Sequence, residues 1–119
     1  MSETLVLSDP TKADLVVYKG DSGRFRISFV APVGDPPVDI TAATWDADIR
    51  LKATDTEILT SFEIVPVVGD VSSVDVILSS DKSEQLPKSA VYDVEMRLGG
   101  EVSTIIYGSV TVKQDVSRP

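Results

Sequence analysis

Two segments of the chain, residues 45–51 and 92–98, alternate bulky apolar residues with charged ones and carry the charges in the same order. The first reads Trp-Asp-Ala-Asp-Ile-Arg-Leu and the second reads Tyr-Asp-Val-Glu-Met-Arg-Leu. A period of two predicts a β-strand with one face toward solvent and one toward a core, because successive side chains of a strand point to opposite faces. The chain therefore contains at least two half-buried strands with the same charge pattern.

We expect these two strands to pair antiparallel, in the register that places each arginine opposite the first acid of the other strand. Opposite charges directly across a ladder contribute about 0.2–1 kcal/mol each. The two central acids then face each other, which is unfavourable unless the diagonal arginines lie over them. We call these six residues the charge ladder, with the expected pairs Arg50–Asp93, Asp46–Arg97 and Asp48–Glu95.

The remaining sequence consists of further short apolar or alternating segments, separated by turns rich in glycine and proline. Seven strands are expected, at residues 15–18, 23–31, 42–52, 58–65, 71–78, 90–98 and 101–113, with a helical turn capped by Ser80 before the sixth. Short strands without a sustained helical period predict an all-β sandwich or barrel. Trp45 on the third strand, Tyr92 near the start of the sixth and the intervening helical turn favour an immunoglobulin-like antiparallel β-sandwich. The third, sixth and seventh strands should then share a sheet.

The length of 119 residues leaves room for one domain with one core. We divide it into an N-terminal arm at 1–13, the sandwich at 14–117 and a tail at 118–119. The arm is either a frayed terminus or a segment that docks on a neighbouring subunit. Its start has neither the basic region nor the apolar run of a secretory signal, and no later segment resembles a membrane span.

The composition removes several classes of function. The chain has no cysteine and no histidine, so disulfides, thiolate metal sites and nucleophile systems that depend on histidine are not expected. Its net charge of −8 repels phosphate backbones and anionic lipid surfaces, so we expect it to bind neither nucleic acid nor membranes.

Four acids of the charge ladder, Asp46, Asp48, Asp93 and Glu95, could together bind a hard cation such as calcium or magnesium. We favour a structural role for them instead, because a flat ladder does not bend around an ion. Outward arginines, including Arg24 and Arg26, are also available to neutralise the acids. No phosphate-binding glycine loop and no cleft between paired carboxylates is evident. We therefore expect no catalytic residues, no cofactor and no small-molecule substrate.

The seventh strand carries apolar residues on both faces, at Ile105, Ile106 and Tyr107. A two-sided apolar strand is normally covered by another surface. We predict a partner interface formed by this strand together with the apolar residues of the arm, Leu5, Val6 and Leu7; the alternative is that the arm itself covers the strand. Gly108, inside the same strand, predicts a bulge or a bend.

Exposed aromatic residues leave a second functional class open. Most of the seven aromatic residues fall on inward positions of the expected strands, whereas Tyr18 and Tyr107 could lie on the surface. Such side chains would suit a glycan-binding module that adheres to a host surface. The alternative is that both tyrosines are half-buried strand residues.

Four groups of residues, spread over about positions 14–117, also resemble a known family in sequence and spacing. They are Tyr18-Lys19-Gly20-Asp21 leading into Phe25-Arg26-Ile27, Pro37-Val38-Asp39-Ile40-Thr41 leading into Ala47-Asp48-Ile49-Arg50, Leu86-Pro87 leading into Tyr92-Asp93-Val94-Glu95, and Tyr107-Gly108-Ser109-Val110-Thr111-Val112 through Asp115-Val116. Together they resemble the small immunoglobulin-like virion proteins of tailed bacteriophages, including the N-terminal domain of baseplate upper proteins.

This resemblance implies a non-enzymatic structural protein that is assembled into virions in the cytoplasm of a bacterial host. Its expected partners are other virion proteins, which it would bind as multiple copies in a symmetric assembly. A minor tail or baseplate component is favoured, and a head decoration or accessory protein is the next alternative. The resemblance implies no catalytic residues.

Overall fold

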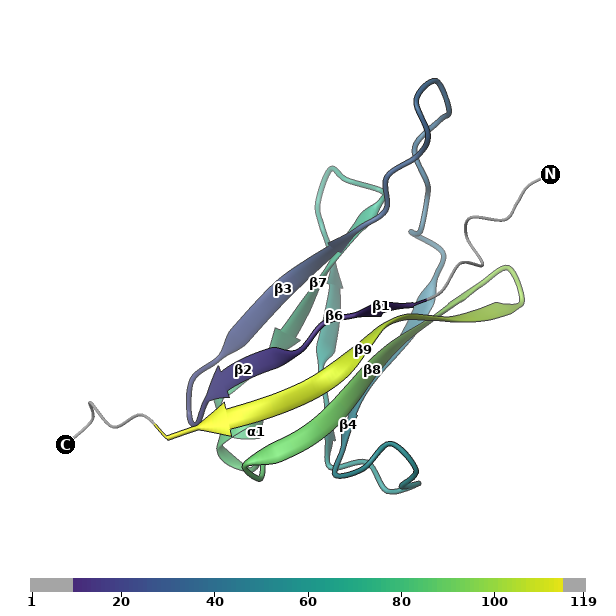
Figure 1. Cartoon of the computed structure of the whole chain (residues 1–119). Coiled ribbons are helices and arrows are strands. Elements are labelled where there is room, and N and C mark those ends of the chain that lie inside the picture. The colour runs from purple at the N-terminus through teal and green to yellow at the C-terminus, as the bar shows by residue number, and fades with distance from the viewer. Residues whose placement is uncertain (1–9, 115–119) are drawn as a thin grey trace.

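Residues 10–114 are described by the structure, a computed structural model, and they form two β-sheets packed face to face (Figure 1). One sheet has the order β1-β9-β8-β4-β5, with β2 also paired to β9. Its strands are β1 (Thr11–Lys12), β2 (Leu15–Tyr18), β4 (Thr44–Arg50), β5 (Thr60–Ser61), β8 (Ser89–Leu98) and β9 (Glu101–Lys113). The other sheet has the order β3-β7-β6, formed by β3 (Gly23–Ser28), β7 (Ser73–Leu78) and β6 (Glu63–Pro66). The expected all-β sandwich is therefore confirmed.

Each of the seven expected strands corresponds to a strand or a pair of short strands. The expected strand at 58–65 is divided into β5 and β6, which belong to different sheets. The expected helical turn is α1 (Ser80–Glu84), but its N-cap is Ser79 rather than Ser80, because the Ser79 hydroxyl accepts the Lys82 N–H. A side-chain acceptor there satisfies one of the free N–H groups of the first turn. Strand β1, which lies within the residues assigned to the arm, pairs with β9.

The core lies between the two sheets and is filled from both. Its largest cluster contains Ile49 and Val94 from one sheet and Val76 and Leu78 from the other, all nearly inaccessible to solvent. Three aromatic rings meet edge to face beside them, with the centroids of Phe62 and Tyr92 5.7 Å apart. Edge-to-face pairs contribute about 0.5–1.5 kcal/mol beyond the area they bury.

Strands β4 and β8 are antiparallel neighbours, as expected, but their register differs by two residues from the expected one. Asp48 faces Asp93 and Asp46 faces Glu95, whereas Arg50 faces Val91 and Arg97 faces Thr44. The predicted directly opposed pairs are therefore wrong. A shift of two residues returns every side chain to the same face, so the apolar pattern cannot distinguish the two registers. The long arginine side chains still reach their acids, now along diagonals.

A β-bulge in β9 explains its run of apolar residues. Val94 pairs with Ile106 and Glu95 pairs with Thr104, so Ile105 is an extra residue on β9. Both Ile105 and Ile106 pack against the core clusters. The inserted residue places the successive side chains of Ile105 and Ile106 on the inner side, so that of the three apolar residues only Tyr107 faces outward.

Gly108 does not form the bulge; it allows the segment between β1 and β2 to approach β9 closely. A Cβ atom at this position would lie 2.1 Å from the carbonyl oxygen of Ala13. Ala13 donates its N–H to the Tyr107 carbonyl (2.8 Å), and the Asp14 carboxylate accepts the Ser109 N–H (3.0 Å). The Tyr92 hydroxyl, from β8, donates to the Ala13 carbonyl (2.6 Å). These contacts fasten the first strands to the last.

Candidate functional site

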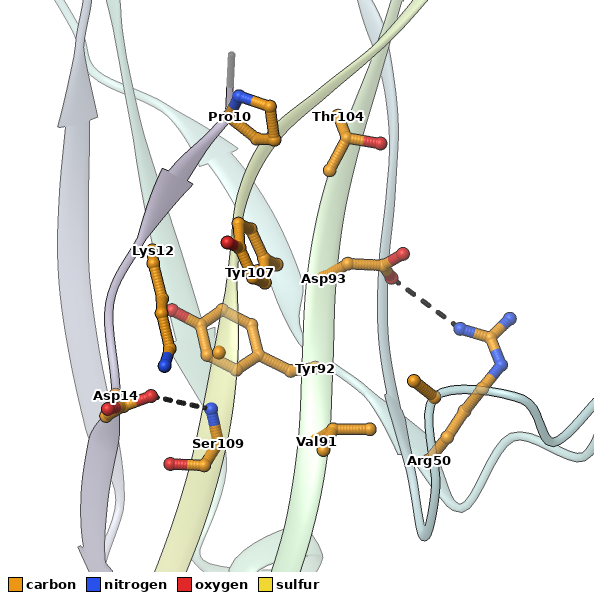
Figure 2. A pocket seen from close by; sticks show the side chains of 12 residues that line it. Pro10, Lys12, Asp14, Arg50, Val91, Tyr92, Asp93, Thr104, Tyr107 and Ser109 are labelled. Carbon is orange, nitrogen blue, oxygen red and sulfur yellow. Dashed lines mark hydrogen bonds and ion pairs between the residues drawn. The ribbon is translucent and has the colours of Figure 1, made fainter.

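The outer face of the larger sheet contains a recess of about 590 Å³ between β1 and the loop after β4 (Figure 2). Its volume falls within the range of roughly 300–1,000 Å³ that is typical of small-molecule sites. We call it the outer recess; it is lined by Pro10, Lys12, Asp14, Arg50, Ala53, Val91, Tyr92, Asp93, Thr104, Tyr107, Gly108 and Ser109.

The bulge in β9 decides which side chains form this recess. Thr104 lies opposite Glu95 on the outer face, and strict alternation from there would turn Tyr107 inward. The extra residue restores Tyr107 to the outer face, where its side chain is 41% exposed. On β8 the outward positions are Val91 and Asp93. Bulges commonly re-aim a side chain in this way beside a binding site.

Asp93 and Arg50 face each other across one side of the outer recess (Figure 2). Nη1 of Arg50 lies 3.6 Å from a carboxylate oxygen of Asp93, and Nη2 of Arg50 lies 3.6 Å from a carboxylate oxygen of Asp48. Burial raises the pKa of the Asp93 carboxyl; Arg50 lowers it, and the nearby Asp48 and Asp46 raise it further. Asp93 is therefore a partly desolvated acid whose charge depends on a single nearby guanidinium.

Lys12 and Asp14 form the opposite side. The backbone N–H of Ser109 lowers the pKa of the Asp14 carboxyl, with smaller contributions from the Ser109 side chain and from Lys12. The Lys12 ammonium makes no hydrogen bond within residues 10–114. The recess thus has two acidic and two basic side chains, and its formal charge is zero.

The charge ladder is one cluster, as expected, but its acids are paired like with like across the strands. Arg97 lies 3.2 Å from Asp46 and 4.0 Å from Glu95, and Arg50 bridges the other acidic pair. Arg24 and Arg26 were expected to help, yet they are on the other sheet and pair with Asp75. Among the residues described, no group of three or more metal-ligating side chains could hold an ion.

Replacing Arg50 with glutamine should raise the pKa of Asp93 further, because Arg50 is the group that lowers it. An acid with a folded-state pKa above its unfolded value favours the folded state as pH falls through the folded pKa, so the variant should gain stability from this group on mild acidification. Residue-specific NMR titration of the aspartate carboxyl carbons would measure the pKa directly. Arg97→Gln is the matched control, since Arg97 contacts Asp46 and Glu95 instead. An unchanged Asp93 midpoint in Arg50→Gln would contradict the expectation.

The predicted partner interface is not a single surface in the structure. Tyr107 is exposed in the outer recess, whereas Ile105 and Ile106 pack against the core. Leu5, Val6 and Leu7 lie outside the described residues. Tyr18, on β2, is exposed but does not line the recess.

Sequence reasoning missed Lys12, Val91, Thr104 and Ser109 as recess residues. The alternation on β8 was a sufficient signal for Val91, since it lies on the same face as Asp93. Alternation could not identify the recess residues on β9, because the bulge determines which of its side chains point to the outer face.

Two of the turns expected from the sequence, at Gly34-Asp35 and Gly69-Asp70, match each other and lie at one end of the sandwich. Residues 32–35 read Pro-Val-Gly-Asp and residues 67–70 read Val-Val-Gly-Asp. In each, the Asp N–H donates to the carbonyl three residues earlier, at 3.0 and 3.2 Å, and the glycine has a positive φ. A turn with positive φ at its third position selects glycine there. We call these the valine turns.

The valine turns lie at the same end because β3 ends where β7 begins, with Ser28 opposite Ser73 (Figure 1). Backbone hydrogen bonds join their bases: Phe29 donates to Ser72, and Ile40 donates to Val71, both at 2.9 Å. The Ser72 hydroxyl also donates to the Val38 carbonyl. At the tips, Val33 is 105% exposed and Val68 is 100% exposed. Two hydrogen-bonded turns therefore hold two apolar side chains entirely in solvent.

No helix within the described residues is long and apolar enough to cross a membrane. Comparison with known proteins adds no family, since the sequence matches no protein-family model and no curated protein.

Proposed function

We propose that this chain is a non-enzymatic structural protein of a tailed bacteriophage virion, which binds neighbouring virion subunits as multiple copies. A minor tail or baseplate component is favoured, and head decoration is the next alternative. Support comes from the four sequence segments that resemble small virion proteins. Parts of the second and third segments, Ala47-Asp48-Ile49-Arg50 and Tyr92-Asp93-Val94-Glu95, lie on the neighbouring strands β4 and β8.

The strand order supports an immunoglobulin-like variant of the sandwich. Immunoglobulin-like domains place the second, fifth and fourth strands in one sheet and the third, sixth and seventh in the other. Here β3-β7-β6 form one sheet and β4-β8-β9 form the centre of the other. The helical turn α1 joins the two sheets between β7 and β8, at the crossover position of that fold.

The observation that carries the proposal is the pair of valine turns. Burying a valine side chain contributes about 1.5–3 kcal/mol relative to leaving it in water. Val33 and Val68 are fully exposed on hydrogen-bonded turns, so neither side chain contributes this burial free energy in the isolated domain. Because the turns are already ordered, a partner that covers both would lose little conformational entropy on binding. We propose that the valine turns contact the neighbouring subunit.

The test uses virions produced with the full chain supplied in trans, and measures copies per purified particle by quantitative mass spectrometry. The double variant Val33→Asp/Val68→Asp is expected to lower incorporation at least tenfold, because each aspartate would have to be desolvated at the interface. Val16→Asp, at an exposed valine of β2, is the control and should incorporate normally. Thermal melting should show that all variants fold.

Absence of the wild-type chain from purified particles would overturn the virion assignment. Normal incorporation of the double variant would retain the assignment but move the contact away from the valine turns.

A further inference from the structure

We propose that the outer recess binds a neutral saccharide, held by Tyr107, Asp93 and Arg50. This inference is independent of membership in a virion, because it depends only on the geometry and charge of the recess.

Unsatisfied hydrogen-bonding capacity is the first argument. The separation of 3.6 Å between Arg50 and Asp93 is an ion pair without a hydrogen bond. Within residues 10–114, neither side chain makes a hydrogen bond to another group, although the Arg50 side chain is only 24% exposed. The N–H donors of the Arg50 guanidinium and the acceptor oxygens of the Asp93 carboxylate therefore lie side by side, and both groups can still form hydrogen bonds with a ligand. Adjacent hydroxyl groups, which both donate and accept, can occupy these positions together.

The hydroxyl-bearing side chains extend this polar surface. Thr104 and Ser109 line the recess on β9, on either side of Tyr107 in the sequence. Lys12, which makes no hydrogen bond in the described residues, adds donors from β1 (Figure 2). Polar groups thus reach the recess from β1, β8, β9 and the end of β4, which suits a ligand with hydroxyls on several sides.

The charge of the recess selects a neutral ligand. Lys12 and Arg50 balance Asp14 and Asp93, so no net local charge attracts an anion or a cation. The overall charge of −8 further repels anions at long range. A purely apolar ligand would remove water from Asp93 and Arg50 without replacing its hydrogen bonds, which is costly.

Tyr107 supplies the apolar contact that a sugar ring needs. Tyr107 is 41% exposed, and its side chain lies over β9 between Lys12 and Asp93 in Figure 2. Its ring offers an apolar face beside polar groups, the combination found in specific small-molecule sites. The bulge in β9 places it there, at a position that the core does not require.

The test is an NMR titration of the isotopically labelled full chain with matched ligands. The panel contains the methyl glycosides of glucose, galactose, mannose and N-acetylglucosamine, and the disaccharides maltose, cellobiose and lactose. Glucuronic acid and glucosamine are the charged counterparts of glucose. We expect at least one neutral saccharide to shift the amide signals of Thr104, Tyr107 and Ser109 in a saturable manner. Glucuronic acid and glucosamine should both bind at least threefold more weakly than that saccharide.

Variants separate the recess from the rest of the surface. Tyr107→Ala and Asp93→Asn are each expected to weaken binding at least tenfold. Tyr18→Ala is the matched control, because Tyr18 is an exposed tyrosine of the same sheet outside the recess. It should leave the affinity unchanged, and the amide spectra should show that every variant is folded.

Three results would overturn the proposal. They are the absence of saturable shifts with every neutral saccharide, shifts that map outside the recess, and tighter binding of glucuronic acid or glucosamine than of the neutral sugars. Loss of binding in Tyr18→Ala equal to that in Tyr107→Ala would also contradict it.

Discussion

Replacing Gly108 with valine is expected to lower the free energy of unfolding by about 3 kcal/mol and to detach β1 and β2 from β9. Any Cβ at this position would lie 2.1 Å from the Ala13 carbonyl oxygen and 2.7 Å from its carbon. Both are backbone atoms, so no side-chain rotation can relieve the overlap, and overpacking of this kind typically costs about 1–3 kcal/mol. The branched side chain places the effect at the upper end of that range.

Gly23→Val is the matched control, since a Cβ there would meet no atom within 4 Å. We expect no comparable loss of stability, because the added Cβ enters open space and overlaps no backbone atom. Urea denaturation measures the stability of both variants. Hydrogen exchange at the amides of Ala13 and Ser109, which bond across the junction, reports detachment. Equal stability of the two variants would show that the close approach at Gly108 is not required.

Replacing Tyr92 with alanine is expected to destabilise the fold by about 3–5 kcal/mol, the usual range for a buried aromatic residue. Tyr92 is 3% exposed, completes the aromatic group with Phe25 and Phe62, and bonds to the Ala13 carbonyl. Tyr92→Phe keeps the ring and removes only that hydrogen bond, so its cost should be about 1 kcal/mol. Tyr107→Phe, at the exposed tyrosine of β9, should have almost no effect. Urea denaturation of the three variants gives the comparison.

Tyr92 also predicts a loss of stability in alkali. Burial raises the pKa of its hydroxyl from the ordinary value of 10.0 to about 12, and the charge of Asp14 adds to the shift. The folded state therefore retains this proton more strongly than the unfolded state, and stability should fall as pH rises between these values. The decrease due to this group should be absent in Tyr92→Phe. A decline of the same size in the variant would assign it to other residues.

Strand positions and fold class could be predicted because alternation at a period of two specifies which residues face the core. The register of β4 and β8 could not, since Trp45 opposite Met96 or opposite Leu98 leaves the same apolar residues inward. The choice depends on three-dimensional packing and on the length of the arginine side chains. The similar charge order of the two segments therefore identified the correct neighbours but the wrong opposing pairs.

The outer recess could be predicted only in part. Asp93 and Arg50 were identified as a contacting pair, and they are one. Tyr107 was identified as a possible surface aromatic residue, and it is exposed, but its outward position depends on the bulge at Ile105, which the sequence did not indicate. An inserted residue reverses which face of the sheet each later side chain of the strand points to. Because Ile105 and Ile106 are both isoleucines, the sequence looks the same with or without the bulge. Gly108 was the visible signal of an irregularity nearby, although its role is the close approach of Ala13.

The parallel pairing of β2 with β9 also determines how the domain responds to mechanical tension. Leu15 lies beside Val110 and Tyr18 beside Lys113, so the two strands run in the same direction. A force that pulls the beginning and the end of the domain apart acts along both strands in opposite senses. This force loads all the hydrogen bonds between β2 and β9 at once in shear, instead of breaking them one after another. Loading in shear slows forced unfolding, and the rate of forced unfolding determines how long the domain survives under tension. The parallel pairing of β2 with β9 therefore places the hydrogen bonds between the first and last long strands of the domain in shear under such a force.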